Sequence, residues 1–359
     1  MTKKSDTPAI RFKGFTDTWE QRKFEEIAVR SSVICSDDTL PRVEYEDIVS
    51  GTGRLNKDIY AKQSIKSGIA FHQGDVLYGK LRPYLQNWLL PTFDGLAVGD
   101  FWVLQPQNAD SSFLYRLIQS RQFDEVANQS TGTKMPRADW KLVSKTVFSI
   151  PSNISEQAAI GTYFTALDSL ITLHQRKYDK LTNVKKSMLE KMFPKNGSNV
   201  PEIRFKGFTE AWEQRKLGEL VDVCSGRDYK HLSEGTIPVY GTGGYMLSVN
   251  DALSYDRDAI GIGRKGTIDR PYILKAPFWT VDTLFYAIPR EKVDLNFAFD
   301  IFQNIDWKKK DESTGVPSLS KTAINDIDVL APKHDEQQTI GQFFAALDDL
   351  ITLHQREPT

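Results

Sequence analysis

The sequence SEQAAIGTYFTALDSLITLHQRK occupies residues 155–177 and returns as DEQQTIGQFFAALDDLITLHQRE at residues 335–357. A second pair precedes it in each half: IRFKGFTDTWEQRK at residues 10–23 and IRFKGFTEAWEQRK at residues 203–216. A weaker pair joins Ser130-Thr131-Gly132 to Ser313-Thr314-Gly315. Self-similarity at this spacing predicts an internal repeat with a pseudo-two-fold relation between its copies.

The segments between these constant elements have diverged. Residues 24–150 and 217–330 share little beyond a rough order of features, whereas the elements around them are nearly identical. Duplication of one stable domain followed by random substitution is the simpler alternative. Random substitution, however, would change the constant and variable segments to a similar extent. The pattern therefore predicts shared docking surfaces on the constant elements and two separately chosen specificities in the variable domains.

A long spacer helix is predicted after Asn153, which can cap it together with Glu156. The positions of its seam, eight of ten of them apolar, alternate by four and three residues, the spacing of a coiled coil. They are Ile160, Phe164, Leu167, Ile171, His174, Tyr178, Leu181, Lys185, Met188 and Met192. Pro194 and Gly197 end the helix. The rise of an α-helix gives a rod of roughly 57 Å, too long for an ordinary globular helix.

A second, shorter spacer helix carries the same seam at Ile340, Phe344, Leu347, Ile351 and His354. Antiparallel pairing of the two helices would place His174 near His354 and residues 175–193 opposite residues 335–353. The earlier half of the first helix, from Ile160 to Leu167, would then lack a partner in this chain. We expect another polypeptide to cover it, or a second copy to form a homodimer, or the chain to be a shortened version of a longer one. The paired histidines are expected to set the register and not to bind a metal.

Each variable domain has short β-rich runs broken by turn residues, such as 74–79, 97–104, 236–240 and 259–262. Short helices are expected near 112–119 and 296–304. The fold class is therefore α+β: two β-rich domains separated by long helices that form an antiparallel coiled coil.

Two basic turns recur at matching places in the variable domains. Each follows an apolar strand opened by Asp, and its Arg and Lys can reach phosphates or guanine edges. Solvated hairpin tips are the simpler interpretation. The candidate DNA-binding residues are Lys80, Arg82, Tyr84, Lys134 and Arg137 in the first domain, and Arg264, Lys265, Arg270, Tyr272, Ser313, Thr314 and Lys321 in the second. Lys308-Lys309-Lys310 is expected to be a solvated helix face.

Composition and motifs exclude several classes of protein. Lys and Arg number 46 against 47 Asp and Glu, so the bulk charge does not favour a nucleic-acid binder but does not exclude one. No apolar run is long enough to span a membrane, and two cysteines favour a reduced cytoplasmic setting over a disulfide or zinc framework. No P-loop, HExxH or GxSxG motif is present. Gly261–Gly266 matches GxGxxG, but Pro271 argues against the helix that a dinucleotide site needs.

The constant elements IRFKGFT…WEQRK, STG…LSK and ALD-x-LITLHQR resemble those of the specificity subunit of type I restriction–modification systems, in the right order and twice. The resemblance implies two target recognition domains that read an asymmetric, split site in double-stranded DNA. It implies docking of two methylation subunits and of restriction subunits that carry motor and nuclease parts. This subunit would catalyse nothing and bind no cofactor, because S-adenosylmethionine, ATP and Mg²⁺ belong to its partners. The short second helix departs from the family pattern.

The resemblance and the repeats together predict four segments: a constant element and first recognition domain at 1–153, a spacer helix at 154–196, a second constant element and recognition domain at 197–332, and a short spacer at 333–359. Two rival functions stay open. One is an enzyme in its own right, such as a nuclease with scattered carboxylates. The other is a scaffold or decoy that sequesters methylation subunits without reading DNA.

Overall fold

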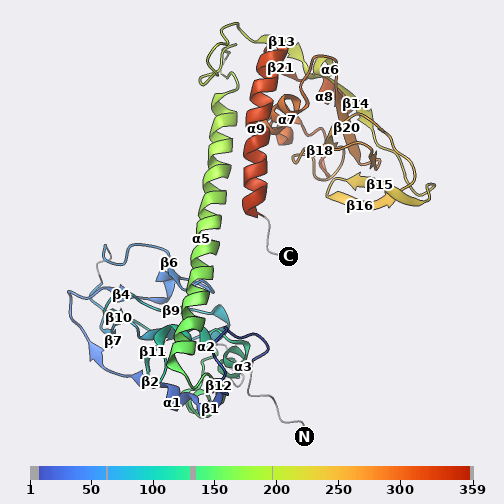
Figure 1. The fold of residues 1–359 in the computed structure, drawn as a ribbon. Helices are drawn as coiled ribbons and strands as arrows, with labels where there is room; N and C mark the ends of the chain where they lie inside the picture. The colour runs from blue at the N-terminus through green and yellow to red at the C-terminus, as the bar shows by residue number, and fades with distance from the viewer. Residues whose placement is uncertain (1–7, 62–63, 130–134, 196, 356–359) are drawn as a thin grey trace. The chain divides into compact units, whose positions relative to one another are not determined.

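The computed structural model describes residues 8–61, 64–129, 135–195 and 197–355. The chain divides into two compact units, Met1–Thr172 and Leu173–Thr359, and the division falls inside one long helix, α5 (Ile154–Lys191). This helix has the predicted length of 38 residues. Asn153 caps it as predicted, because its side-chain oxygen accepts a hydrogen bond from the Ser155 N–H at 2.8 Å. Figure 1 draws α5 as a single helix without a break.

The first unit contains two four-stranded sheets, ordered β2-β11-β8-β9 and β3-β7-β10-β4. A short pair, β1 with β12, closes the unit where the constant element meets the end of the variable domain. The strands are β1 (Glu20–Lys23), β2 (Ala28–Ser31), β3 (Ile34–Cys35), β4 (Arg42–Val43), β5 (Ile48–Val49), β6 (Arg54–Leu55), β7 (Gly68–Phe71), β8 (Val76–Gly79), β9 (Trp88–Leu89), β10 (Gly95–Ala97), β11 (Phe101–Pro106) and β12 (Val147–Ile150). The helices are α1 (Phe24–Ile27), α2 (Ser111–Leu117), α3 (Arg121–Ala127) and α4 (Trp140–Lys145), with 3₁₀ turns at Tyr45–Asp47 and Pro83–Leu85.

Strand β11 shows why these runs are apolar at every position. Phe101 and Val103 enter a core between the two sheets, whereas Trp102 and Leu104 enter the core under the helices. A strand buried on both faces needs no polar alternation. The run 97–104, predicted as one strand region, is two strands in different sheets, because Gly99 adopts a φ of 102° between them.

The second unit repeats the order of the first sheet as β14-β20-β17-β18 and repeats the short pair as β13 and β21, but its other sheet has three strands, ordered β16-β15-β19. Its strands are β13 (Glu213–Lys216), β14 (Val221–Ser225), β15 (Glu234–Gly241), β16 (Gly244–Val249), β17 (Ala259–Gly263), β18 (Tyr272–Leu274), β19 (Trp279–Thr280), β20 (Leu284–Pro289) and β21 (Asp328–Ala331). Its helices are α6 (Leu217–Leu220), α7 (Leu295–Asn304), α8 (Lys321–Asn325) and α9 (His334–Gln355), with a 3₁₀ turn at Trp307–Lys310. The short helices predicted near 112–119 and 296–304 are therefore confirmed as α2 and α7.

Helix α9 lies antiparallel to the second half of α5 within this unit (Figure 1). His174 meets His354 with 2.9 Å between their Nδ1 atoms, as the predicted register requires. Further along, Lys185 pairs with Asp348, and the Phe193 and Phe344 rings lie 6.3 Å apart. The seam residues Ile340, Phe344 and Leu347 are buried in the core of the unit.

The first half of α5 differs in part from the prediction. Ile160 was expected to lack a partner, but it packs against the core of the first recognition domain. Phe164 and Ile171 are exposed at 45% and 62%, and Leu167 is half-buried. The domain core thus covers the start of the helix, and the uncovered apolar face begins about one turn later.

Candidate nucleic-acid interface

The first basic turn leaves strand β8 and is held by three backbone hydrogen bonds. The Lys80 N–H donates to the Asp100 carbonyl at 2.9 Å, the Arg82 N–H to Pro136 at 2.7 Å, and the Ala138 N–H to Lys80 at 2.8 Å. These bonds bring the segment after the first Ser-Thr-Gly alongside the turn. The structure therefore brings Arg137 next to Lys80 and Arg82, although it lies far from them in the sequence. Lys134 lies outside the described residues.

The charges at this turn are partly neutralised. Asp100 contacts Arg137 at 3.0 Å and Lys80 at 3.5 Å. Burial raises the pKa of Asp100, but the hydrogen bond and charge of Arg137, helped by Lys80, outweigh it and hold the pKa below its usual value. The same pair raises the pKa of Arg137. Within the described part of the chain Arg82 has no carboxylate partner, and its φ is 50°, a left-handed conformation that is strained for arginine.

The second basic turn has the same framework with other side chains. The Arg264 N–H donates to Thr283 at 2.8 Å, the Gly266 N–H to Pro317 at 2.9 Å, and the Leu319 N–H to Arg264 at 3.0 Å. These three bonds match those of the first turn one for one. Gly266 stands where the first domain has Arg82, with a φ of 88°. Arg264 and Lys265 are both exposed.

The other candidate DNA-binding residues differ in how far their side chains are exposed. Arg270 and Lys321 are exposed, and so is Tyr84 at 57%. Tyr272 is half-buried; its hydroxyl donates to the Gly241 carbonyl at 2.6 Å, and burial raises its pKa. Tyr272 therefore packs against the domain core through its ring, and its contact with DNA stays a prediction.

The loop that follows the second Ser-Thr-Gly has its own anchor. Asp311 accepts hydrogen bonds from the N–H groups of Ser313 and Ser318 at 3.0 and 2.9 Å. Thr314 is exposed on this loop. The anchor closes the loop on itself, and the Leu319 N–H bond to the Arg264 carbonyl joins the loop to the turn. Lys308 and Lys309 are exposed and pair with Asp269 and Asp306, as expected for a solvated face.

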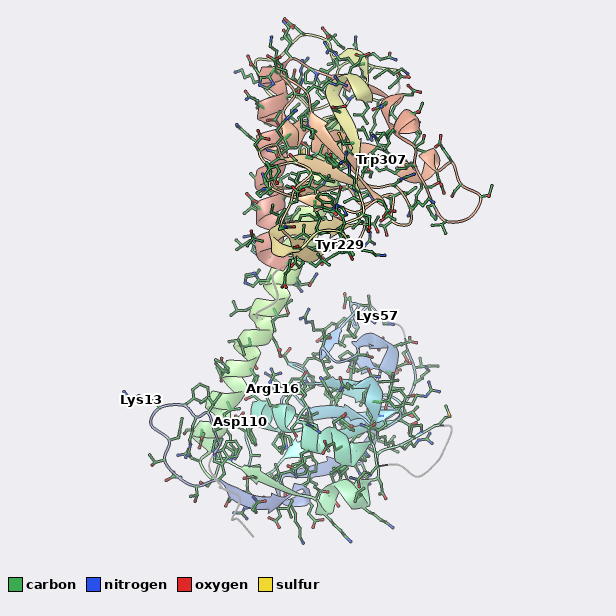
Figure 2. The ribbon with its side chains drawn as sticks, turned by 90° about the vertical axis from the view of Figure 1, so that its right-hand side faces the viewer. Lys13, Lys57, Asp110, Arg116, Tyr229 and Trp307 are labelled. Atoms are coloured by element: carbon green, nitrogen blue, oxygen red, sulfur yellow. The ribbon has the colours of Figure 1, made fainter. Side chains whose placement is uncertain are left out.

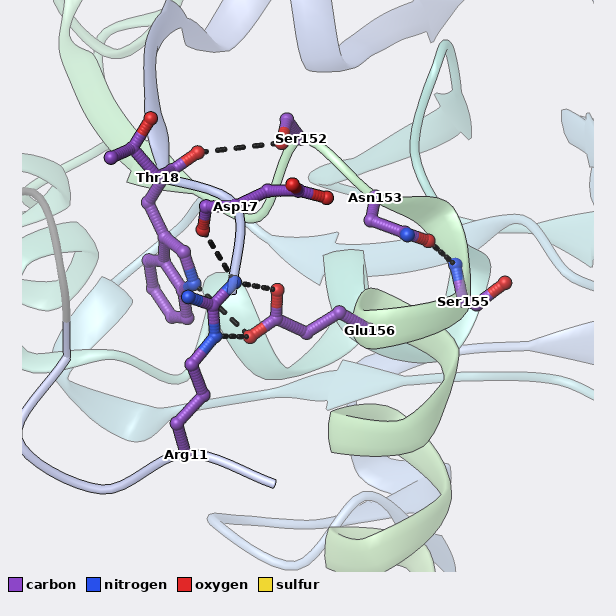
Figure 3. A network of polar contacts seen from close by, with 8 residues as sticks. Arg11, Asp17, Thr18, Ser152, Asn153, Ser155 and Glu156 are labelled. Carbon is purple, nitrogen blue, oxygen red and sulfur yellow. Dashed lines mark hydrogen bonds and ion pairs between the residues drawn. The ribbon is translucent and has the colours of Figure 1, made fainter. Parts of the chain in front are cut away.

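The constant elements contain a buried network that sequence reasoning missed. Glu156, in the first turn of α5, accepts two hydrogen bonds of 2.7 Å from Arg11 and one of 3.3 Å from the Trp19 indole (Figure 3). Arg204, Trp212 and Glu336 repeat this network in the second unit, with 2.7 Å from the arginine. The repetition of Arg, Trp and Glu inside the identical blocks was the available signal. The network ties each constant element to the start of its spacer helix.

The two helices next to the spacers dock identically. The Asp110 N–H donates to the Gln157 side chain, and the Asp294 N–H donates to Gln337. Gly161 lies against Ser112, where a Cβ would come within 1.8 Å of its hydroxyl. Figure 2 labels Asp110, which caps α2, and Arg116 within that helix. The constant parts thus hold the two recognition domains to their helices in the same way.

Other kinds of site find no support. Among the described residues, no three His, Cys, Asp or Glu side chains gather as a metal site. No described helix is both long enough and apolar enough to cross a membrane. Gly261–Gly266 leads from β17 into a turn and then β18, so the helix required for a dinucleotide site is not there.

Comparison with known proteins identifies the family. The model of the type I restriction modification DNA specificity domain matches residues 17–183 and 209–359. The chain belongs to the family of type I restriction–modification specificity subunits. Such a subunit recognises DNA and is not an enzyme; the catalysis lies on other subunits. The rival interpretation as an independent nuclease is thereby set aside.

Relatives in sequence and solved structures of similar fold also belong to type I systems. The MjaVIII specificity subunit of Methanocaldococcus jannaschii is 23% identical over 326 residues, covering 76% of this chain and 75% of that protein. The EcoDI specificity subunit of Escherichia coli is 25% identical over 187 residues, or 49% of this chain and 42% of that protein. The crystal structure of the S subunit from M. genitalium shares the fold, with a TM-score of 0.65, 17% identity and coverage of 97% and 94%. A chain solved in work on assembly and conformational transition of a type I system matches at a TM-score of 0.50, with 15% identity and coverage of 96% and 93%.

Proposed function

We propose that this specificity subunit reads an asymmetric DNA target in two parts, one for each recognition domain. The observation that carries the proposal is the pair of basic turns. One backbone framework of three hydrogen bonds presents Lys80, Arg82 and Arg137 in the first domain, but Arg264 and Lys265 in the second. A shared frame with different side chains suits two readers of different base sequences.

The first turn gives Arg82 the leading role. Lys80 and Arg137 both form ion pairs with Asp100. These two residues are therefore assigned to phosphates at the edge of the site. Arg82 is exposed and stands in a conformation that glycine adopts at no cost in the other domain. Strain retained at one side chain is typical of a functional position. Arg82 is therefore the proposed base-reading residue, because arginine is bidentate toward guanine.

The constant elements are proposed to dock two methylation subunits, which bind S-adenosylmethionine, and restriction subunits, which use ATP and Mg²⁺. The exposed helix residues repeated in both copies support this: Leu170 and Leu350 are exposed at 52% and 43%, and Leu173 and Leu353 at 60% and 62%. Identical apolar side chains left exposed twice suit two identical partners. The decoy alternative would use the same face without any readout of DNA.

The test is methylome sequencing of cells that express this chain with its methylation subunit. We expect methylated adenines in one split, asymmetric motif, and a change in only one half of that motif when residues 24–150 are replaced by another variable domain. Methylation without a motif, or a symmetric motif, would contradict the proposal. A pulldown that captures the methylation subunit without sequence preference on DNA would favour the decoy.

Single substitutions sharpen the test. In the assembled methyltransferase, Arg82→Glu should weaken binding to the cognate site by about 1–3 kcal/mol and relax one half-site. Arg264→Glu should do the same to the other half only. Arg121→Glu is the matched control, because Arg121 is 92% exposed on α3 and lies outside the turn.

A further inference from the structure

Two equivalent helices carry an arginine and an aspartate at one position. Asp110 and Asp294 cap α2 and α7 and bind Gln157 and Gln337 in the same way, so the two helices can be aligned from their caps. Six residues after the caps stand Arg116 in the first unit and Asp300 in the second. The constant helices that they face carry the same aspartate in the ALD motif, Asp168 and Asp348.

In the second unit the positive charge beside the ALD aspartate belongs to the spacer helix α5. Lys185 of α5 pairs with Asp348, and its ammonium lies 5.9 Å from the centre of the Phe299 ring. Lys185 is only 11% exposed. Asp300 is buried beside them; burial raises the pKa of its carboxyl, and the positive charge of Lys185 opposes that rise.

In the first unit Arg116 supplies that cation itself. Its guanidinium contacts Asp168 at 2.7 Å and lies 4.9 Å from the ring of Tyr115, the equivalent of Phe299. It also lies 5.8 Å from Phe164, on the uncovered face of α5. Arg116 thus has the same two neighbours, an aspartate and an aromatic ring, that Lys185 has in the second unit.

The uncovered face in the first half of α5 resembles the face of α9, so both could pack against the second half of α5, which carries Lys185. Residues 155–175 and 335–355 are near-copies. The first half of α5 from a second chain could therefore take the place of α9 against residues 173–191 of the first chain, the half of α5 that carries Lys185 (the lysine-bearing half). Two α5 helices would then pair antiparallel about His174. What separates the two faces is the side chain beside them, because a docked Lys185 would meet the guanidinium of Arg116 on one face and the carboxyl of Asp300 on the other.

We infer that Arg116 and Asp300 select the partner of the lysine-bearing half of α5. The face of α9, beside Asp300, accepts it, whereas the corresponding face of α5, beside Arg116, excludes it. The spacer therefore closes within one chain and does not pair with a second copy. Like charges brought together in a partly buried contact are an established means of rejecting a wrong partner. This selectivity is additional to DNA recognition and does not depend on it.

A double-mutant cycle on the full chain tests the contact. Lys185→Ala and Asp300→Arg should each lower the melting temperature, the first by leaving Asp348 unpaired and the second by placing two cations together. The double variant should lose on the order of 5 °C less than the sum of the single losses, because Arg at 300 can replace the lysine as Arg116 does. Lys186→Ala, at an exposed position on the same helix, is the control and should be additive with Asp300→Arg. Additive losses for Lys185 would overturn the inference.

The oligomeric state tests the selection. At micromolar concentration, light scattering should give the mass of one chain for the wild type. The exchanged variant Arg116→Asp/Asp300→Arg should give the mass of two, through paired α5 helices. A wild-type dimer that Lys185→Ala dissociates, or an exchanged variant that stays monomeric with an unchanged melting temperature, would refute the inference. If the exchanged variant does not fold, the cycle decides alone.

Discussion

Replacement of Glu336 by alanine tests the buried network that joins the second constant element to α9. The carboxylate is 3% exposed and accepts two hydrogen bonds of 2.7 Å from Arg204 and one of 3.4 Å from the Trp212 indole. Alanine leaves the guanidinium with the Glu210 carbonyl and leaves the indole N–H without its acceptor.

The expected cost follows from burial. Removing one member of a fully buried ion pair costs about 3–5 kcal/mol. Arg204 is 12% exposed and keeps one carbonyl partner, which lowers that part to about 2 kcal/mol, while the unpaired indole adds about 1 kcal/mol. The sum of about 3 kcal/mol corresponds to a fall of roughly 6–12 °C in the melting temperature of a unit of this size.

Differential scanning calorimetry of the full chain is the assay. Glu336→Ala should lower the transition of the second unit alone, and Glu156→Ala should lower that of the first. Glu213→Ala is the control, because Glu213 is 67% exposed and its ion pair with Arg215 should contribute within about 0.5 kcal/mol. A shift for Glu336→Ala no larger than that of the control would refute the assignment of this network as the structural lock.

Three further predictions follow from the first unit. The hydrogen bond and charge of Arg11 lower the pKa of Glu156 below its usual 4.5, so their stabilisation is present above that value and is lost as the pH falls through the folded-state pKa; acid titration followed by circular dichroism should show a smaller loss in Glu156→Gln than in the wild type. Gly161→Ala would place a Cβ 1.8 Å from the Ser112 hydroxyl and 2.8 Å from its carbonyl carbon, and should destabilise the unit by about 2 kcal/mol in urea unfolding; an unchanged midpoint would show that α2 does not dock there. Arg82→Gly relieves a left-handed arginine, so the free energy of unfolding should stay the same or rise by up to about 1 kcal/mol while DNA binding by the complex weakens; a variant that binds DNA normally would remove Arg82 from the interface.

The sequence predicted most of the helical framework because helical periodicity and capping are local signals. Asn153 marked the start of α5 and the repeat gave the contact of His174 with His354, since both follow from register alone. The sequence also marked the two basic turns. It did not reveal that Arg137 reaches the first turn, because that contact depends on a backbone pairing between Leu81 and Arg137 across the fold.

The sequence by itself determined the repeat, the α+β class, the spacer helices and, through the constant motifs, the family. Only the tertiary structure decided that the divergent domains share the strand order of one sheet, that Tyr272 packs against the core, that Ile160 is covered, and that Arg116 and Asp300 occupy equivalent places. The physical reason is that periodicity records which face of an element is apolar. The partner that covers this face depends on contacts between residues far apart in the chain, and those follow from packing and charge together.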